Sequence, residues 1–291
     1  LLLSFVQHPH FTQQATEREK KIIASEITMY DDDPGWIVFF DLLKNLYHNH
    51  TVKNPIAGTT ESIQQISAEI LQKSYEAYYT PENFFLVCAG EIDSERVLEL
   101  AENIMKPTNG HRAVSLFEKE PEAVVKAYTK TDMSLMKPIF QIGFKQKPQE
   151  DIKGIKQMYL LRMALDILAG ESSSFFEKAY EKQWIQEPLG CEFFSGEGYA
   201  FTAFSAAGPQ PQKTAQLLLE EIEQIQKQGI CEEVFERAKK KQIGRMIRSF
   251  NSIYAICMGQ LELAMKNRDL FDGFHILQSI KKEEVQRVFQ K

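Results

Sequence analysis

The chain contains 291 residues, 43% of them hydrophobic and 25% charged, a composition typical of a globular protein with room for two domains of ordinary size. Its 34 basic and 40 acidic residues give a net charge of -6, so it lacks the dominant basic field expected of a nucleic-acid-binding protein. No apolar run is long enough to cross a bilayer, and we expect neither a nucleic-acid nor a membrane partner.

The chain begins LLLSFVQ, which does not resemble a signal peptide because no charged segment precedes the apolar one. These residues read as the end of a helix whose beginning is absent from the sequence. Four cysteines are far apart and form no C-x-x-C pair, and three of them stand beside apolar residues. We expect buried, reduced thiols and a cytoplasmic protein. The cysteines are Cys88, Cys191, Cys231 and Cys257.

Residues 17–34, EREKKIIASEITMYDDDP, are predicted to form an amphipathic helix whose apolar residues make one buried stripe. Glu19 and Glu26 are seven residues apart, just under two helical turns, so their carboxylates share a face. A carboxylate on the face that also carries the apolar residues requires a hydrogen bond, a counter-charge or a metal ion. The apolar residues are Ile22, Ile23, Ile27 and Tyr30.

Both glutamates also have purely structural explanations. Thr16 and Glu19 have the spacing of a capping box, in which Glu19 folds back onto the first turn. Glu26 would then lie at the edge of a solvated face, as glutamates in helices commonly do. The spacing alone favours these structural roles over a metal site, because glutamates are ordinary residues of solvated helices.

Three more helices and one strand are predicted in the rest of the first half. Asp33 is expected to cap a helix whose first residue is a proline, and Ser67 to cap a helix that ends before Pro81. Residues 84–89 form a short continuous apolar run, which is typical of a strand buried on both faces. Asp93 begins the next helix.

Residues 107–122 lose this periodicity and gain proline, glycine and charge, as linkers do. We place the linker at 111–122, between a first domain of residues 1–110 and a second of residues 123–291. The same alternation of strands and long helices is predicted on both sides of the linker. This pattern favours an α+β fold with a duplicated domain.

The second half is predicted to contain four strands, two of them in a hairpin around Gly196-Glu197-Gly198. A basic group within a helical pattern is expected to be a solvated helix face. The strands are 123–131, 138–145, 190–195 and 199–205; the helices are 155–168, one opened by Ser172, 214–228, 232–250, 253–267 and a short one near the end; and the basic group is Lys239, Lys240, Lys241, Arg245 and Arg248.

Several segments, in this order, resemble the pitrilysin/insulinase family of zinc metallopeptidases, the inverzincins, and most closely its YmfH-like bacterial branch. The resemblance covers nearly the whole chain and implies two homologous α/β-sandwich domains, the first incomplete at its N-terminus. It also implies that peptides are cleaved in a chamber between domains. The matching segments are Glu19 to Ile27, Ile56 to Thr59 with Glu61-Ser62-Ile63, Tyr78 to Asn83 leading into LVCAGEID, and Leu168 to Gly170 with Ser172 to Ser174 and Phe176.

The resemblance assigns chemistry to the two glutamates. The family binds zinc through the two histidines of an H-x-x-E-H helix and a glutamate from a later helix, which matches Glu26. Glu19 matches a nearby supporting acid of the catalytic site, which would orient or tune the zinc ligands. Three protein ligands leave one position for a water molecule whose acidity the zinc ion raises.

The sequence departs from the family in its histidines. None of the six belongs to an H-x-x-E-H motif, and the pairs His8/His10 and His48/His50 have the spacing of strand or loop residues. In the family this motif lies upstream of the matching glutamate, so it would belong before Leu1; the alternative is a relative of the family that lacks H-x-x-E-H. The chain alone should then hold no catalytic zinc and be inactive. The two remaining histidines are His111 and His275.

A second departure concerns the arginine and tyrosine that face the zinc from the second domain of active members. The matching stretch, residues 180–186, replaces both. Because related peptidases divide these roles between two subunits, we expect the zinc-type subunit of a heterodimer, whose homologous partner subunit supplies the missing pair. The alternatives are a non-catalytic structural or binding partner with the same fold, and an unrelated α/β protein whose glutamates are caps and surface charges.

Overall fold

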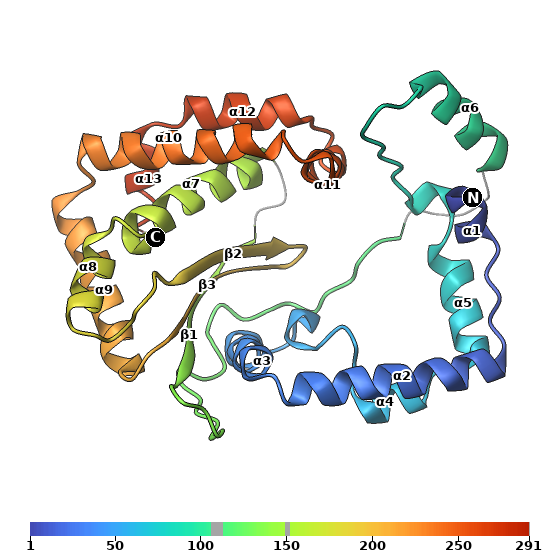
Figure 1. The fold of residues 1–291 in the computed structure, drawn as a ribbon, viewed down its shortest axis with the longest axis horizontal. Coiled ribbons are helices and arrows are strands. Elements are labelled where there is room, and N and C mark those ends of the chain that lie inside the picture. Colours follow the sequence, from blue (N-terminus) through green and yellow to red (C-terminus); the bar gives the residue numbers. More distant parts are fainter. Residues whose placement is uncertain (106–112, 149–151, 291) are drawn as a thin grey trace.

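The computed structural model describes residues 1–105, 113–148 and 152–290. A three-stranded sheet lies between helices on both of its faces, and a helical arm built from the N-terminal residues curves away from it (Figure 1). The fold is therefore α+β, as the sequence predicts. None of the described helices is long and apolar enough to cross a membrane.

The sheet is antiparallel and has the strand order β1-β3-β2. The predicted hairpin is confirmed, since β2 and β3 are joined by a turn in which Gly198 adopts a φ of 79°. This positive φ favours glycine, and a Cβ atom at this position would make a tight contact of 3.1 Å with the His50 ring. The strands are β1 Ile139–Gln146, β2 Gly190–Gly196 and β3 Tyr199–Ala207.

Alternate residues of these strands build two separate cores. One face carries Phe140 and Phe204 into the large core against α7, whose Met163 is fully buried. The opposite face carries Phe201 and Ala203 into a smaller core with α3. The sheet is thus the middle of three layers. The helices in contact with the large core are α7 Ile152–Ala169, α8 Ser174–Glu181, α9 Pro211–Gln228, α10 Glu232–Ser249, α11 Ile253–Ala264, α12 Leu270–Ser279 and α13 Lys282–Gln286.

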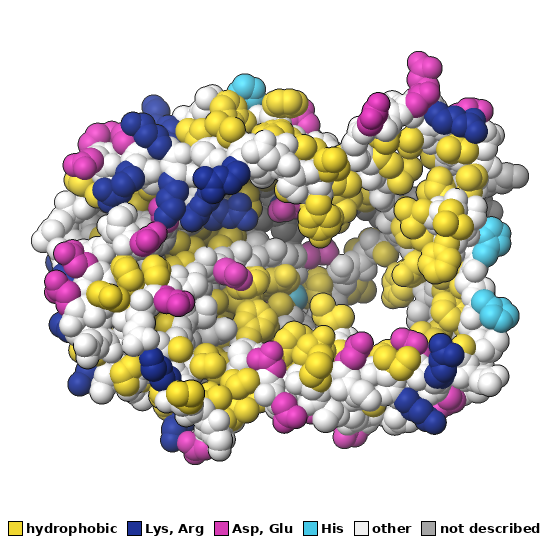
Figure 2. All heavy atoms as spheres, viewed as in Figure 1, with side chains coloured by type: hydrophobic (Ala, Val, Ile, Leu, Met, Phe, Trp, Pro, Cys, Tyr) yellow, Lys and Arg dark blue, Asp and Glu magenta, His cyan; other side chains and the backbone are white. Residues whose placement is uncertain are grey.

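The arm extends away from the sheet through α2 and α5, and its residues 84–88 approach α11 (Figure 1). There the Cys257 thiol of α11 lies 3.5 Å from the Val87 carbonyl oxygen. Figure 2 shows a hollow between the arm and the sheet-containing part, with hydrophobic side chains on its sides. The N-terminal elements are α1 Leu2–Gln7, α2 Gln13–Asp31, α3 Pro34–Leu46, η1 Thr51–Lys53, α4 Thr60–Gln64, α5 Ala68–Tyr78, η2 Pro81–Asn83 and α6 Ser94–Ile104.

The helix starts follow the predicted caps in most cases. Asp33 accepts hydrogen bonds from the first turn of α3, and Ser67 and Asp93 cap α5 and α6. The capping box proposed for Thr16 is wrong: Thr12 caps α2, and Thr16 lies buried inside the helix. Ser173, rather than Ser172, caps α8.

Two predicted strands are wrong. Residues 84–89 are irregular and partly exposed, because residues 1–105 contain no other strand to accept their backbone hydrogen bonds. Residues 123–131 are irregular as well. The backbone N–H groups of Val125 and Lys126 bond to the Asn45 carbonyl oxygen at the end of α3 instead of to β1.

The prediction of buried thiols holds for only part of the set. All four cysteines are free, but Cys88 and Cys231 are exposed. Cys191 and Cys257 are half-buried, and burial raises the pKa of the Cys191 thiol to about 12. An apolar neighbour in sequence does not bury a residue when the segment is irregular and partly exposed, as at Cys88, or stands at a helix start, as at Cys231.

Candidate metal centre on helix α2

Helix α2 has one buried side and one exposed side with a distinctive composition. The buried side carries Lys20, which donates hydrogen bonds to Glu17 and to the Gln64 carbonyl oxygen and so fixes α2 against α4. Glu19, Ile22, Glu26 and Met29 recur at intervals of three and four residues and lie along an exposed side of α2.

This exposed side alternates acids with apolar residues. Ile22 is 45% exposed and Met29 is 62% exposed. The prediction that Ile22 belongs to the buried stripe is therefore wrong, although Ile27 is buried and Ile23 is half-buried. We name Glu19, Ile22, Glu26 and Met29 the α2 face.

The two glutamates of the α2 face are free of internal partners. Both carboxylates are exposed, and neither makes a hydrogen bond or ion pair with any described residue. Glu17, two residues before Glu19, is different, because Lys20 pairs with it at 2.8 Å and lowers the pKa of its carboxyl group. Glu19 and Glu26 are about 10 Å apart along the helix axis, so they cannot both bind one ion.

A catalytic zinc site needs three protein ligands, and the described part of the chain does not bring three together. His8 and His10 lie between α1 and α2, and His48 and His50 follow α3, in loops as predicted. The residues present thus fit one ligand of a zinc site and not the whole of it. His111 lies outside the described residues, and exposed His275 is on α12.

Residues 180–186, where the sequence predicts that the arginine and tyrosine are replaced, span the end of α8. Tyr180 is exposed and packs on Phe176. Trp184 lies between two lysines, with Lys182 4.7 Å and Lys213 5.9 Å from its ring centre. This stretch contains no arginine.

Sequence reasoning missed a buried charge cluster where the linker crosses the sheet. The Glu120 carboxylate accepts hydrogen bonds from the consecutive backbone N–H groups of residues 48–50 and pairs with Lys145 of β1. Burial alone would raise the pKa of Glu120, but Lys145 and the three N–H groups lower it to about 2. A glutamate within the charged run EKEPE gives no sequence signal of this role.

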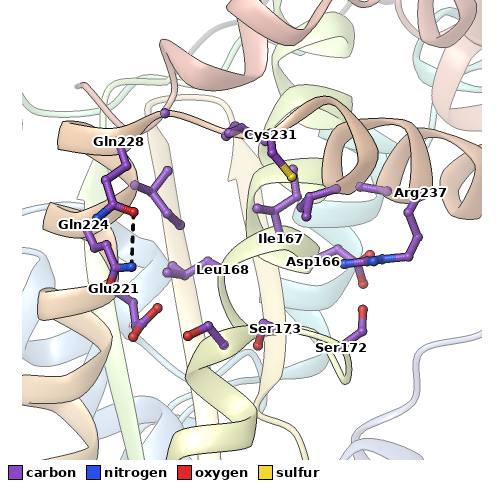
Figure 3. Close-up of a pocket in the computed structure, with 16 residues that line it drawn as sticks. Asp166, Ile167, Leu168, Ser172, Ser173, Glu221, Gln224, Gln228, Cys231 and Arg237 are labelled. Atoms are coloured by element: carbon purple, nitrogen blue, oxygen red, sulfur yellow. Dashed lines mark hydrogen bonds between the residues drawn. The ribbon is translucent and has the colours of Figure 1, made fainter.

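Several pockets lie near the large core. One, about 1100 Å³, separates the hairpin end of the sheet from α7 and opens beside Glu120 and Lys145. A smaller one, about 260 Å³, lies between the end of α7 and the start of α10. Figure 3 shows Asp166, Glu221 and Arg237 among the polar groups around it.

Comparison with known families matches most of the chain. The family described as "Insulinase (Peptidase family M16)" matches residues 1–60, which include the α2 face. The family described as "Peptidase M16 inactive domain" matches residues 65–242.

Individual relatives agree. The "Uncharacterized zinc protease YmfH" of Bacillus subtilis is 34% identical across 100% of this chain and 69% of its own length. The "Non-peptidase homolog YmxG" of Helicobacter pylori is 23% identical over 84% of this chain and 56% of its own length. The crystal structure of an M16-like peptidase from Alicyclobacillus acidocaldarius superposes with a TM-score of 0.90 at 27% identity, over 99% of this chain and 70% of that one.

Proposed function

The chain belongs to the M16, or insulinase, family of peptidases, and we propose on that premise that it is part of a zinc-dependent endopeptidase in which Glu26 is a zinc ligand. The relatives named zinc proteases support the metal and the reaction class. Peptides would be cleaved in a chamber between domains, and the compartment would be the cytoplasm.

The α2 face carries this proposal. Two carboxylates without partners alternate with two exposed apolar residues, and such a face is suited to a second helix that buries Ile22 and Met29. A helix bearing H-x-x-E-H would place its histidines beside Glu26. The motif does not occur in these 291 residues, so in this proposal that helix would come from outside them.

The residues of this chain would have separate tasks. Glu26 would supply one negatively charged oxygen ligand, and zinc bound there would lower the pKa of a water molecule. Glu19 is too far along the helix to bind the same ion. It would instead accept a hydrogen bond from a ligating histidine and hold that ring in place.

A second subunit completes the proposal. Residues 180–186 lack the arginine that active members use, and the exposed end of α8 offers no substitute. We therefore propose a homologous partner subunit that supplies the arginine and tyrosine for the peptide carbonyl group.

A second candidate function is that of a non-catalytic partner with the same fold. The description "Peptidase M16 inactive domain" for residues 65–242 and the name of the Helicobacter pylori relative favour it. In that case the α2 face would contact another protein without binding zinc.

Cleavage of internally quenched peptides separates these functions. The full-length gene product, mixed with a homologous subunit from the same organism, should cleave them, and a zinc chelator or Glu26→Gln should abolish cleavage. Glu17→Gln is the control, because Glu17 lies on the same helix and pairs with Lys20. Full activity of Glu26→Gln, or of the full-length protein alone as a monomer, would contradict the proposal in its metal or its dimer part, respectively.

A further inference from the structure

Helix α10 carries a row of basic side chains that neither the core nor the proposed zinc site uses. Arg237, Lys241, Arg245 and Arg248 recur at intervals of four, four and three residues, so they lie on one side of the helix. The row extends about 16 Å along the helix axis. Figure 2 shows Lys and Arg side chains gathered along the course of α10. We name these four residues, with the neighbouring Lys240, the α10 basic row.

Most members of the α10 basic row have no acidic partner among the described residues. Lys241 pairs with Asp166 in the last turn of α7, and Arg237 extends toward the same residue at the edge of the small pocket (Figure 3). The other members are exposed and make no ion pair with the described residues. A chain with a net charge of -6 thus concentrates unpaired cations on one helix.

The structure of α10 itself does not require the row. Cations stabilise a helix through its dipole only within the last turn, and Arg248 is the member of the row that lies there. Arg237 and Lys240 are two turns or more from the helix end. The charges of Lys240 and Arg245, which pair with no described residue, are therefore available for a partner.

An exposed apolar group lies at the end of the row, where α10 is followed by α11. Ile253 and Tyr254 in the first turn of α11 and Phe271 in the first turn of α12 are all exposed, and Phe250 stacks on Phe271. In Figure 2 the basic side chains along α10 are followed by hydrophobic ones over α11, beside the hollow. Large apolar side chains gathered at one place mark a contact surface.

We propose that the α10 basic row and this apolar group bind an extended acidic polypeptide segment that ends in apolar residues. About five residues of extended chain span the row, which allows a carboxylate at every second position to meet a cation. The inference rests on the proposed function in one respect, namely that the bound segment is part of a peptidase substrate. Binding itself requires no zinc.

The test measures binding without cleavage. In the full-length Glu26→Gln protein, fluorescence anisotropy would follow a labelled peptide of alternating glutamate and alanine that ends in two leucines. Its counterpart has glutamine for every glutamate. The double variant Arg245→Gln/Arg248→Gln should lower affinity for the acidic peptide about tenfold. The matched control Lys73→Gln/Arg96→Gln changes the same charge on α5 and α6 of the arm and should leave affinity unchanged.

Salt adds a second readout, because contacts between exposed charges weaken as ionic strength rises. Equal affinity for the glutamine peptide, or wild-type affinity of the double variant, would overturn the inference. Stronger competition by an RNA oligonucleotide than by unlabelled acidic peptide would also overturn it and would assign the row to nucleic acid. If Arg245→Gln/Arg248→Gln, in protein that retains Glu26, loses binding of the acidic peptide but keeps zinc-dependent cleavage, the proposed function stands.

Discussion

Lys145 and Glu120 form an ion pair with 2.6 Å between Nζ and Oε1, and their side chains are only 8% and 10% exposed. Lys145 also donates to the Pro121 carbonyl oxygen, and its ammonium group lies 4.8 Å from the centre of the Tyr47 ring. With the backbone of residues 48–50 on the other side of Glu120, the pair joins the end of α3, the linker and β1. It is one of the polar contacts between the first part of the chain and the sheet, beside the hydrogen bond from the Tyr47 hydroxyl to the Ala200 carbonyl oxygen.

Removing the cation should be costly, because Glu120 would remain buried without its counter-charge. We expect Lys145→Met to lower the free energy of unfolding by roughly 3–5 kcal/mol. Lys147→Met is the control: Lys147 pairs with Glu122 at 2.7 Å, but both side chains are 78% exposed, and the change should stay within about 0.5 kcal/mol. Urea unfolding of both variants measures the difference, and equal losses would contradict the role of burial.

The same pair predicts a pH dependence. The pKa of Glu120 is lowered to about 2 in the folded chain from an ordinary value of 4.5. Its contribution to stability is therefore complete above pH 4.5 and is lost as the pH falls from about 4.5 to about 2. Glu120→Gln should remove this part of the acid sensitivity. Thermal unfolding across this range would reveal it as a wild-type slope steeper than that of the variant, and parallel slopes would refute it.

The N-terminal cap of α3 can be tested at Asp33. It accepts hydrogen bonds from the backbone N–H groups of Gly35 and Trp36 at 2.8 and 3.2 Å. We expect Asp33→Ala to destabilise the protein by about 1 kcal/mol. Asp32→Ala is the control, because Asp32 lies at the C-terminal end of α2 and its side chain caps no helix. Removal of its negative charge should leave the stability unchanged or raise it slightly. The two melting temperatures check this, and an equal effect of both changes would argue against the cap.

The thiols should differ in reactivity. Cys88 and Cys231 are exposed, whereas burial raises the pKa of Cys191 to about 12. At pH 8 an alkylating reagent should therefore modify the two exposed cysteines well before Cys191. Peptide mass spectrometry over time measures the order. Rapid modification of Cys191 in the folded protein would contradict its position in the core.

Local signals in the sequence predict most of the helices and the hairpin. Asp33 followed by proline, Ser67 before an apolar period, and Gly198 in a two-residue turn each specify their structure within a few residues. The packed strands β1 and β3 also follow directly from their apolar content. These elements depend little on distant parts of the chain.

The errors arise where structure depends on a distant partner. Residues 84–89 have the composition of a buried strand but no neighbouring strand among residues 1–105, and residues 123–131 bond to Asn45 instead of β1. Glu120 is buried by contacts with residues about 70 positions earlier. At the candidate site, spacing places Glu19 and Glu26 on one side of α2, but the exposure of Ile22 beside them becomes visible only in the folded chain.

The zinc content of the full-length gene product, purified without added metal beside its Glu26→Gln and Glu17→Gln variants, tests the central claim most directly. The proposed ligand role of Glu26 predicts about one zinc ion per chain in the wild type and in Glu17→Gln, and its loss in Glu26→Gln. Zinc retained in Glu26→Gln, or absent from all three proteins, would contradict that role and favour the non-catalytic partner.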